Sequence, residues 1–236
     1  MLFILSAQFL HNNLDKFCCA RLNIFKPWVL KTLILKGLNR YDLLPIALCP
    51  LKRVVPLDKS FVPSGLVVTD ENENNFHNFV DPNFKPMIKD FVFDYFNSFN
   101  ESAILDGYNY IIDSGYRSFE YLQAIWDYNV SKMGLEKNRD RVAPPGCSEH
   151  QSGLTIDIAS LRYGIYSYLN NEEIAYLMRN IYKYGFILRY PESKEIITGY
   201  NYEPWHYRFV GVDLATYLTK EKLTLEEYHE RILLKK

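Results

Sequence analysis

Hydrophobic and polar positions alternate along residues 154–159. Leu154, Ile156 and Ile158 would form one face of this segment and Asp157 would lie on the other, which is the pattern of a half-buried strand. Three shorter apolar stretches predict further strands at residues 108–112, 186–189 and 206–210. The first of these strands would end at a turn formed by Ser114 and Gly115.

Between these strands, apolar residues recur every three to four positions and predict helices. One such pattern covers residues 84–99. Ser118 is placed to cap a helix that reaches about Val130. Two pairs of residues have the spacing of a capping box, Asn170 with Glu173 and Thr224 with Glu227. Gly185 would end the helix that begins at Asn170. Strands and helices follow one another without a regular βαβ rhythm, so we predict the α+β class.

The composition fits a globular chain and excludes two classes of protein. Of 236 residues, 48% are hydrophobic and 23% are charged, which disordered and collagen-like chains do not show. Lys and Arg number 27 against 28 Asp and Glu, so the net charge of −1 argues against sequence-independent binding of nucleic acid. No run of about 18 apolar residues is present, and we predict no transmembrane helix.

The first 54 residues differ from the rest. Their scattered apolar residues are interrupted by prolines, and the apolar start lacks the basic region and cleavage site of an ordinary signal peptide. We predict that residues 1–54 form a separate N-terminal segment, either an atypical export segment or an accessory element, and that residues 55–236 form the main domain. The four cysteines have neither the density of a disulfide scaffold nor the repeated spacing of a zinc ribbon.

Two short segments carry most of the candidate chemistry. His150 precedes the strand that contains Asp157, and Glu203 stands three residues before His206. An aspartate within a strand is costly if that face is buried, unless it is paired or binds a metal. Two imidazoles and a carboxylate are the ligands of an open catalytic zinc site, with one carboxylate to spare. Spacing alone leaves two alternatives open: ordinary hydrogen-bonded side chains, or a closed site in which Cys147 is a fourth ligand.

These segments and several others resemble the VanY-type D-alanyl-D-alanine carboxypeptidases, within the group of zinc peptidases that includes lysostaphin and the hedgehog domain. The resemblance covers about residues 55–234, with the motifs in order. They are Ser114-Gly115-Tyr116-Arg117-Ser118, Ser148-x-His150-x-x-Gly153-x-x-x-Asp157, Tyr184 to Pro191, Glu203-x-x-His206, and Leu225-Glu226-Glu227-Tyr228.

The resemblance implies a small, mostly antiparallel sheet flanked by helices, and one zinc ion per chain. It implies that the metal ligands are His150, Asp157 and His206, and that Glu203 is the general base. Arg117 and Ser148 match the positions that hold the terminal carboxylate of the substrate. The family often has a glutamine five residues after this arginine. This chain has Leu122 there and Gln123 next, so Gln123 is a further candidate for substrate binding.

The function implied by the resemblance is removal of the terminal D-Ala from peptidoglycan stem peptides by a zinc D,D-carboxypeptidase. Its partner would be the stem peptide, and it would act in the cell envelope, on the periplasmic or extracellular side. Two alternatives remain: an L,D-carboxypeptidase that trims tetrapeptide stems, and a non-catalytic wall-binding domain that keeps the zinc. A base at Glu203 beside a full ligand set speaks against the second alternative.

Overall fold

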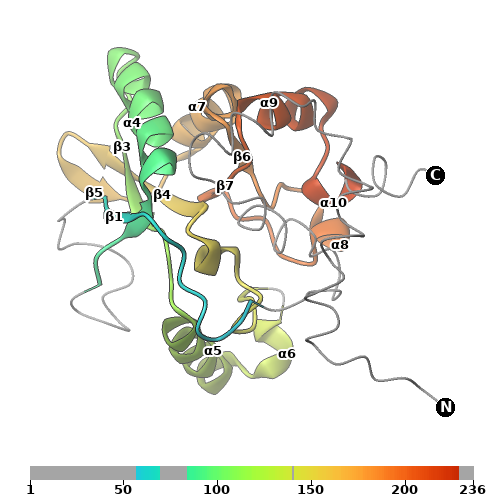
Figure 1. The fold of residues 1–236 in the computed structure, drawn as a ribbon. Coiled ribbons are helices and arrows are strands. Elements are labelled where there is room, and N and C mark those ends of the chain that lie inside the picture. The colour runs from blue at the N-terminus through green and yellow to red at the C-terminus, as the bar shows by residue number, and fades with distance from the viewer. Residues whose placement is uncertain (1–56, 70–83, 140, 229–236) are drawn as a thin grey trace, which may run out of the picture.

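The computed structural model describes residues 57–69, 84–139 and 141–228. The predicted N-terminal segment, residues 1–54, lies outside the described residues. Strands and helices are interspersed along the chain (Figure 1). In order they are β1 (Leu66–Val68), β2 (Met87–Lys89), α4 (Asp90–Leu105), β3 (Tyr110–Ser114), α5 (Phe119–Met133), α6 (Leu135–Asn138), the 3₁₀ turn η1 (Glu149–Ser152), β4 (Thr155–Arg162), β5 (Ile165–Ser167), α7 (Asn171–Asn180), the 3₁₀ turn η2 (Ile181–Tyr184), β6 (Phe186–Leu188), α8 (Glu195–Thr198), β7 (His206–Phe209), α9 (Val212–Glu221) and α10 (Leu225–Tyr228).

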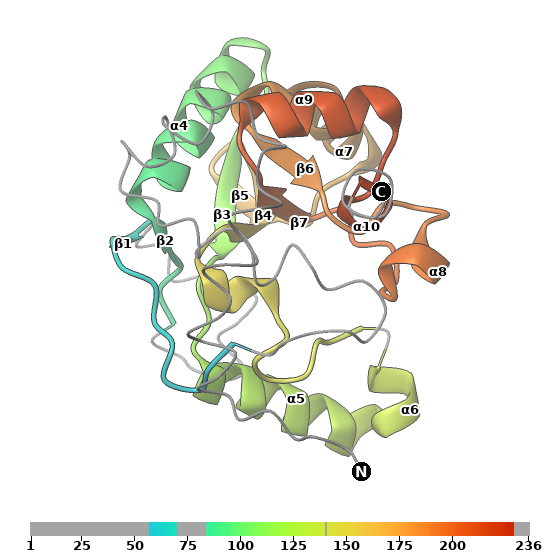
Figure 2. The ribbon, with the colours of Figure 1, turned by 45° about the vertical axis from the view of Figure 1, so that its right-hand side comes forward.

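An antiparallel sheet occupies the middle of the molecule. Its strands are ordered β3-β4-β7-β6, and β5 pairs with the last residues of β4. Strands β1 and β2 form a separate two-stranded sheet. Helices α7 and α9 lie near one end of the molecule, whereas α5 and α6 lie at the other end (Figures 1 and 2). The structure confirms the predicted α+β class and the small antiparallel sheet flanked by helices.

The alternation predicted for β4 is present and separates the core from the candidate site. Leu154, Ile156 and Ile158 are buried in the main core, where they join Phe96 and Phe99 of α4. Successive side chains of a strand point to opposite faces. The neighbouring positions therefore face away from this core, and the site described below is built on that second face.

Three predicted helix starts are confirmed by their capping contacts. The side chain of Ser118 accepts a hydrogen bond from the amide of Tyr121 at 3.2 Å. The side chain of Asn170 accepts from the Glu173 amide at 3.0 Å, and the Glu173 carboxylate accepts from the Asn170 amide at 2.9 Å. Thr224 and Glu227 make the same reciprocal pair before α10, at 3.2 and 2.8 Å. These contacts satisfy amide groups that the first turn of a helix leaves without a partner.

The helix predicted over residues 84–99 is wrong at its beginning. Residues 87–89 form β2, which pairs with β1, and α4 begins at Asp90. The apolar residues before Asp90 fit a helical period, but pairing with a strand some twenty residues earlier decides their conformation. Such a partner cannot be read from a local pattern.

Gly115 allows the chain after β3 to pass close to β2. A Cβ atom at this position would lie 2.0 Å from the carbonyl oxygen of Met87. The next residue, Tyr116, donates its amide hydrogen to that same oxygen at 2.5 Å. Only glycine permits this approach of two backbone segments, and it fixes where the Gly115 carbonyl lies relative to the site.

Candidate active site

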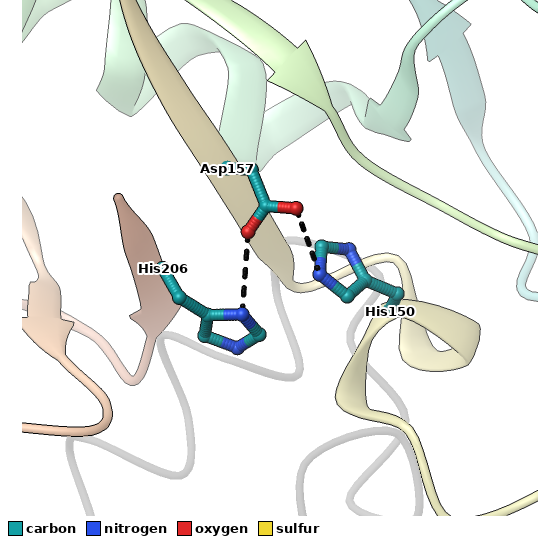
Figure 3. A group of neighbouring side chains, drawn as sticks. All are labelled: His150, Asp157 and His206. Carbon is teal, nitrogen blue, oxygen red and sulfur yellow. Dashed lines mark ion pairs between the residues drawn. The ribbon is translucent and has the colours of Figure 1, made fainter. Parts of the chain in front are cut away.

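Three predicted ligands, from three separate parts of the chain, meet on the second face of the sheet (Figure 3). His150 belongs to the turn η1, Asp157 to β4 and His206 to the start of β7. Asp157 and His206 are directly opposite one another in the register of β4 and β7, so their side chains emerge side by side. All three are buried, and each offers a ligand atom within 4.8 Å of the others.

The donor atoms have spacings that suit a small cation. His150 Nε2 lies 3.4 Å from Asp157 Oδ2, and His206 Nδ1 lies 3.2 Å from Asp157 Oδ1. Ligand atoms about 2.1 Å from a tetrahedral zinc lie about 3.4 Å from one another. Asp157 Oδ1 is buried and has no well-directed hydrogen bond from the described part of the chain, so a lone pair remains for a cation. These three residues therefore fit zinc as the two-histidine, one-carboxylate set of an open site.

The His150 ring is oriented by the backbone after β3. Its Nδ1 lies 2.6 Å from the carbonyl oxygen of Gly115, and because a carbonyl can only accept, Nδ1 carries the hydrogen. The other nitrogen, Nε2, then presents its lone pair toward Asp157. A backbone carbonyl behind a metal-binding histidine fixes the tautomer in this way.

Charges around the ligands favour a cation at this place. Burial opposes a charge on His206, but the carboxylates of Asp157 and Glu149 raise its pKa to about 9. Burial lowers the pKa of His150 to about 4, and the Arg117 cation adds to this effect. Burial opposes ionisation of Asp157, yet His150 and Arg117 hold its pKa well below the usual range. The site thus contains the ionised carboxylate of Asp157 between two imidazoles, and the surroundings of His206 stabilise a positive charge.

Glu203 stands beside the three ligands but outside their group. Its Oε2 lies 3.5 Å from His206 Nδ1, at the end of the connection that leads into β7. Burial raises the pKa of Glu203 to about 7, although the positive charge of His206 opposes this. A carboxyl group with such a pKa can accept and return a proton near neutral pH.

The site opens into a cavity of about 730 Å³. Two residues predicted to bind substrate, Arg117 and Ser148, line it together with Glu203. Arg117 forms an ion pair with Asp157 and donates from Nε to the Ser114 hydroxyl at 2.9 Å. The Ser148 hydroxyl accepts from the His150 amide at 3.4 Å and so caps η1.

Gln123 is the one predicted site residue that the structure does not bring to the cavity. Its amide group donates to Asp127 Oδ1 at 2.9 Å, one turn further along α5. Leu122, at the position where the family often has glutamine, lines the cavity instead. One residue of displacement turns a helical side chain by about 100°, which separates the two. Among the described residues, Cys147 does not join the metal-ligand group, and it is a free, partly exposed thiol.

Several residues that line the cavity were not singled out from the sequence, and Asp113 and Tyr190 are two of them. Asp113 lies near the end of β3 and Tyr190 follows β6. The ring of Tyr190 contacts that of His206, with centroids 4.8 Å apart and the ring planes tilted by 43°. Asp113 could have been found as a charged residue that continues an apolar strand, and Tyr190 lies within a segment that carries the family resemblance. Each had a signal, but neither had a partner in the sequence that would indicate its role.

Comparison with known proteins gives the same family as the motifs. The chain is 39% identical over 179 residues to the putative carboxypeptidase YodJ of Bacillus subtilis. The aligned region covers 75% of this chain and 64% of that relative, so the chain spans less than two thirds of the relative's length. A structure of the LdcB LD-carboxypeptidase matches with a TM-score of 0.64 and 38% identity, over 75% of this chain and 82% of that one. A structure of a mutant of the vancomycin resistance D,D-pentapeptidase VanY in complex with Zn(II) matches with a TM-score of 0.60 and 33% identity. The match covers 78% of this chain and 98% of that one.

The family model described as VanY, D-alanyl-D-alanine carboxypeptidase, matches residues 86–212, which is more than half of the chain. This range begins just before β2 and contains His150, Asp157, Glu203 and His206. The chain therefore belongs to the VanY family of D-alanyl-D-alanine carboxypeptidases.

Proposed function

We propose that this protein is a zinc-dependent carboxypeptidase that removes the C-terminal D-Ala from peptidoglycan stem peptides. The observation that carries the proposal is the meeting of His150, Asp157 and His206 beside Glu203, at the wall of a cavity that also contains Arg117. Family membership supports the reaction class, and the Zn(II) complex of a VanY relative supports the metal. Because the substrate is a cell-wall peptide, we also propose that the protein acts in the cell envelope.

His150 Nε2, Asp157 and His206 Nδ1 would hold the zinc. Zinc supplies Lewis acidity, which lowers the pKa of water and polarises a peptide carbonyl. Glu203 would take the proton of the attacking water on a carboxylate oxygen and would deliver it to the leaving amine. Its burial beside His206 keeps it within reach of the reacting atoms without making it a fourth ligand.

Arg117 would bind the terminal carboxylate of the substrate, with Ser148 beside it. The planar guanidinium can donate two parallel hydrogen bonds to a carboxylate. In the structure it is paired with Asp157, and a divalent cation on Asp157 would weaken that ion pair. The guanidinium could then bind the substrate instead. If productive binding requires a free terminal carboxylate, the enzyme would cleave only the last peptide bond of the chain.

The direct test is to incubate the zinc-loaded protein with pentapeptide and tetrapeptide stems and to identify the products by mass. We expect loss of one D-Ala from the pentapeptide. Cleavage of the tetrapeptide alone would instead show an L,D-carboxypeptidase, the activity named for one structural relative. A zinc-loaded protein that binds stems and cleaves neither would be the non-catalytic wall-binding domain.

Arg117→Ala is expected to lower kcat/KM on the pentapeptide by about 10–100-fold, because a hydrogen bond to a charged group contributes about 1.5–3 kcal/mol. The measurement pairs this variant with a substrate whose terminal carboxylate is amidated. The parent should cleave the amide slowly, and the variant should lose little more on it, since both changes remove one interaction.

A matched control for this experiment is Arg139→Ala. Arg139 is exposed and pairs with Glu136 on α6, so its loss should leave kcat/KM unchanged. Equal cleavage of the acid and the amide by the parent would contradict a carboxylate-binding role for Arg117. It would point to an endopeptidase instead.

A further inference from the structure

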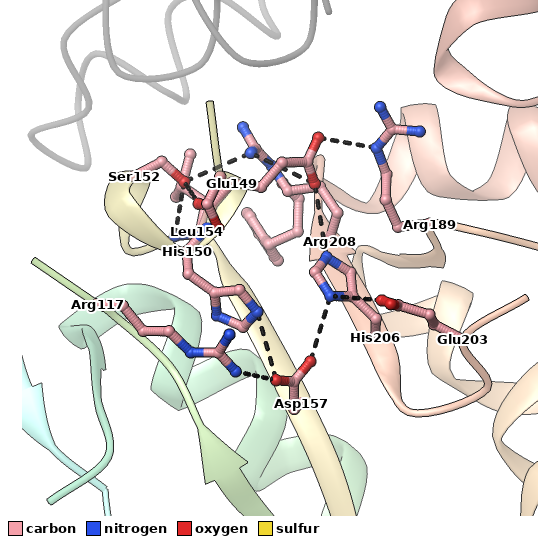
Figure 4. A network of polar contacts seen from close by, with 12 residues as sticks. Arg117, Glu149, His150, Ser152, Leu154, Asp157, Arg189, Glu203, His206 and Arg208 are labelled. Atoms are coloured by element: carbon pink, nitrogen blue, oxygen red, sulfur yellow. Dashed lines mark hydrogen bonds and ion pairs between the residues drawn. The ribbon is translucent and has the colours of Figure 1, made fainter. Parts of the chain in front are cut away.

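A buried network of charged side chains lies behind His206, on the side away from Asp157 (Figure 4). Arg189 is at its centre and donates from Nε to Glu149 Oε1 at 2.8 Å. The same guanidinium donates to both carboxylate oxygens of Glu226 on α10, at 3.0 and 2.5 Å. Arg208 of β7 completes the network, with Nη1 3.9 Å from Glu149 Oε2. All four side chains are almost completely buried.

Glu149 connects this network to the metal ligands. It precedes His150 in η1, and its Oε2 lies 3.9 Å from Nε2 of His206. Both of these atoms are buried, and neither makes a hydrogen bond with any residue that the structure describes. His206 therefore presents Nδ1 to Asp157 and Nε2 to the Glu149 carboxylate. A shift of less than 1 Å would close the Glu149 contact to hydrogen-bond distance.

We infer that Glu149 is a positioning residue for the metal site, and that Arg189 and Glu226 hold it in place. This inference rests on the proposed function, in which His206 binds zinc through Nδ1. Once that contact has closed, Glu149 accepts the Nε2 hydrogen, and this selects the tautomer whose Nδ1 lone pair faces the metal. A carboxylate behind a metal-binding histidine acts in this way in many metal sites, and its loss costs about 10–100-fold in metal affinity.

The charge of the network supports this role. Glu149 and Glu226 balance Arg189 and Arg208, so the buried group is neutral as a whole. Neutralising either carboxylate leaves an uncompensated guanidinium close to a site that must hold a cation. Because charges in a poorly hydrated interior are weakly screened, this excess would weaken zinc binding even where His206 itself is unchanged.

The network also gives a function to the Leu225-Glu226-Glu227-Tyr228 motif. Helix α10 lies beyond residues 86–212, the range that the family model matches. Glu226 is 20 residues away from His206 in sequence, and its connection to the site runs through Arg189 and Glu149. The C-terminal helix is therefore part of the support of the metal site.

The test measures the zinc dissociation constant by competition with a chromogenic chelator, in the full chain, for three variants. Glu149→Gln keeps the volume of the side chain and should weaken zinc binding by about 10–100-fold. Glu226→Gln, which does not touch His206, should weaken it in the same direction by a smaller factor. Glu227→Gln, on the same helix as Glu226, is the matched control. It breaks an ion pair with Lys194, which precedes α8, and a glutamine can still cap α10. It should leave zinc affinity unchanged.

The unfolding temperature of each zinc-free variant separates positioning from stability. Zinc affinity that falls only in proportion to stability, in Glu227→Gln as in the other two, would overturn the inference. A folded Glu149→Gln variant with the parent's zinc affinity would overturn it as well. If Glu149→Gln does not fold, Glu226→Gln decides by the same comparison. A parent that binds no zinc would contradict the metal assignment itself.

Nitrogen-15 NMR of the zinc-loaded parent gives a second readout. His206 should carry its hydrogen on Nε2, with Nδ1 bound to the metal. The opposite tautomer in a zinc-loaded, active protein would overturn the role of Glu149 and the assignment of Nδ1 as the ligand atom of His206. Zinc-dependent hydrolysis of the stem peptide would still stand.

Discussion

Replacing His206 with alanine is expected to remove both the bound zinc and the hydrolysis of stem peptides. The parent should retain about one zinc per chain after dialysis, and the variant almost none, because two remaining ligands do not form a stable zinc site. Among the residues that the structure describes, His150 is the one other histidine, and it already belongs to the ligand set. Zinc content is measured by atomic absorption and turnover by the mass of the released peptide.

His77→Ala is the control for this experiment, since it removes an imidazole that lies outside the family motifs. It should keep both zinc and turnover. Circular dichroism checks that the His206→Ala variant is folded before its zinc content is interpreted. Full zinc stoichiometry in folded His206→Ala would show that the ligand set is assigned wrongly.

Much of the fold could be predicted because the deciding interactions are local. The alternation of Leu154, Ile156 and Ile158 fixes which face of β4 enters the core, and it requires no knowledge of the neighbouring strands. The capping pairs at Asn170 and Thr224 involve residues only three positions apart. Such short-range contacts leave a direct trace in the sequence.

Other features depend on contacts between distant segments. Residues 87–89 became a strand because β1 pairs with them, and the helical period of the segment did not reveal this. Leu122 and Gln123 could not be distinguished until α5 was placed relative to the cavity. Glu149 lies inside the His150 motif, yet its role depends on Arg189, which is 40 residues away in sequence.

The residues that gather at the site were easier to predict than the groups that orient them. Spacing alone left alternatives open for His150, Asp157, Glu203 and His206, and the order of several motifs that resemble the VanY family assigned them to one site. The atoms that orient them, such as the Gly115 carbonyl, carry no side-chain signature. A motif therefore indicates which residues gather at a site, and the fold shows which atoms orient them.

Glu203→Gln is expected to keep the zinc and to lose about 10²–10⁴-fold in turnover. Glutamine has nearly the shape of glutamate but cannot accept a proton, and loss of a general base has this magnitude. The loss corresponds to about 3–5 kcal/mol of transition-state stabilisation. Because Glu203 lies outside the group of His150, Asp157 and His206, zinc content should equal that of the parent.

The paired control is Glu192→Gln, an exposed glutamate on the same connection between β6 and β7. It loses the same charge from the protein without changing the site, so its kcat should equal that of the parent. Three outcomes of Glu203→Gln are then distinct. Loss of turnover with full zinc identifies the base, loss of zinc makes Glu203 a ligand, and parental turnover with full zinc places the base on another residue. Only the first agrees with a carboxyl group that is buried beside His206, with a pKa raised to about 7.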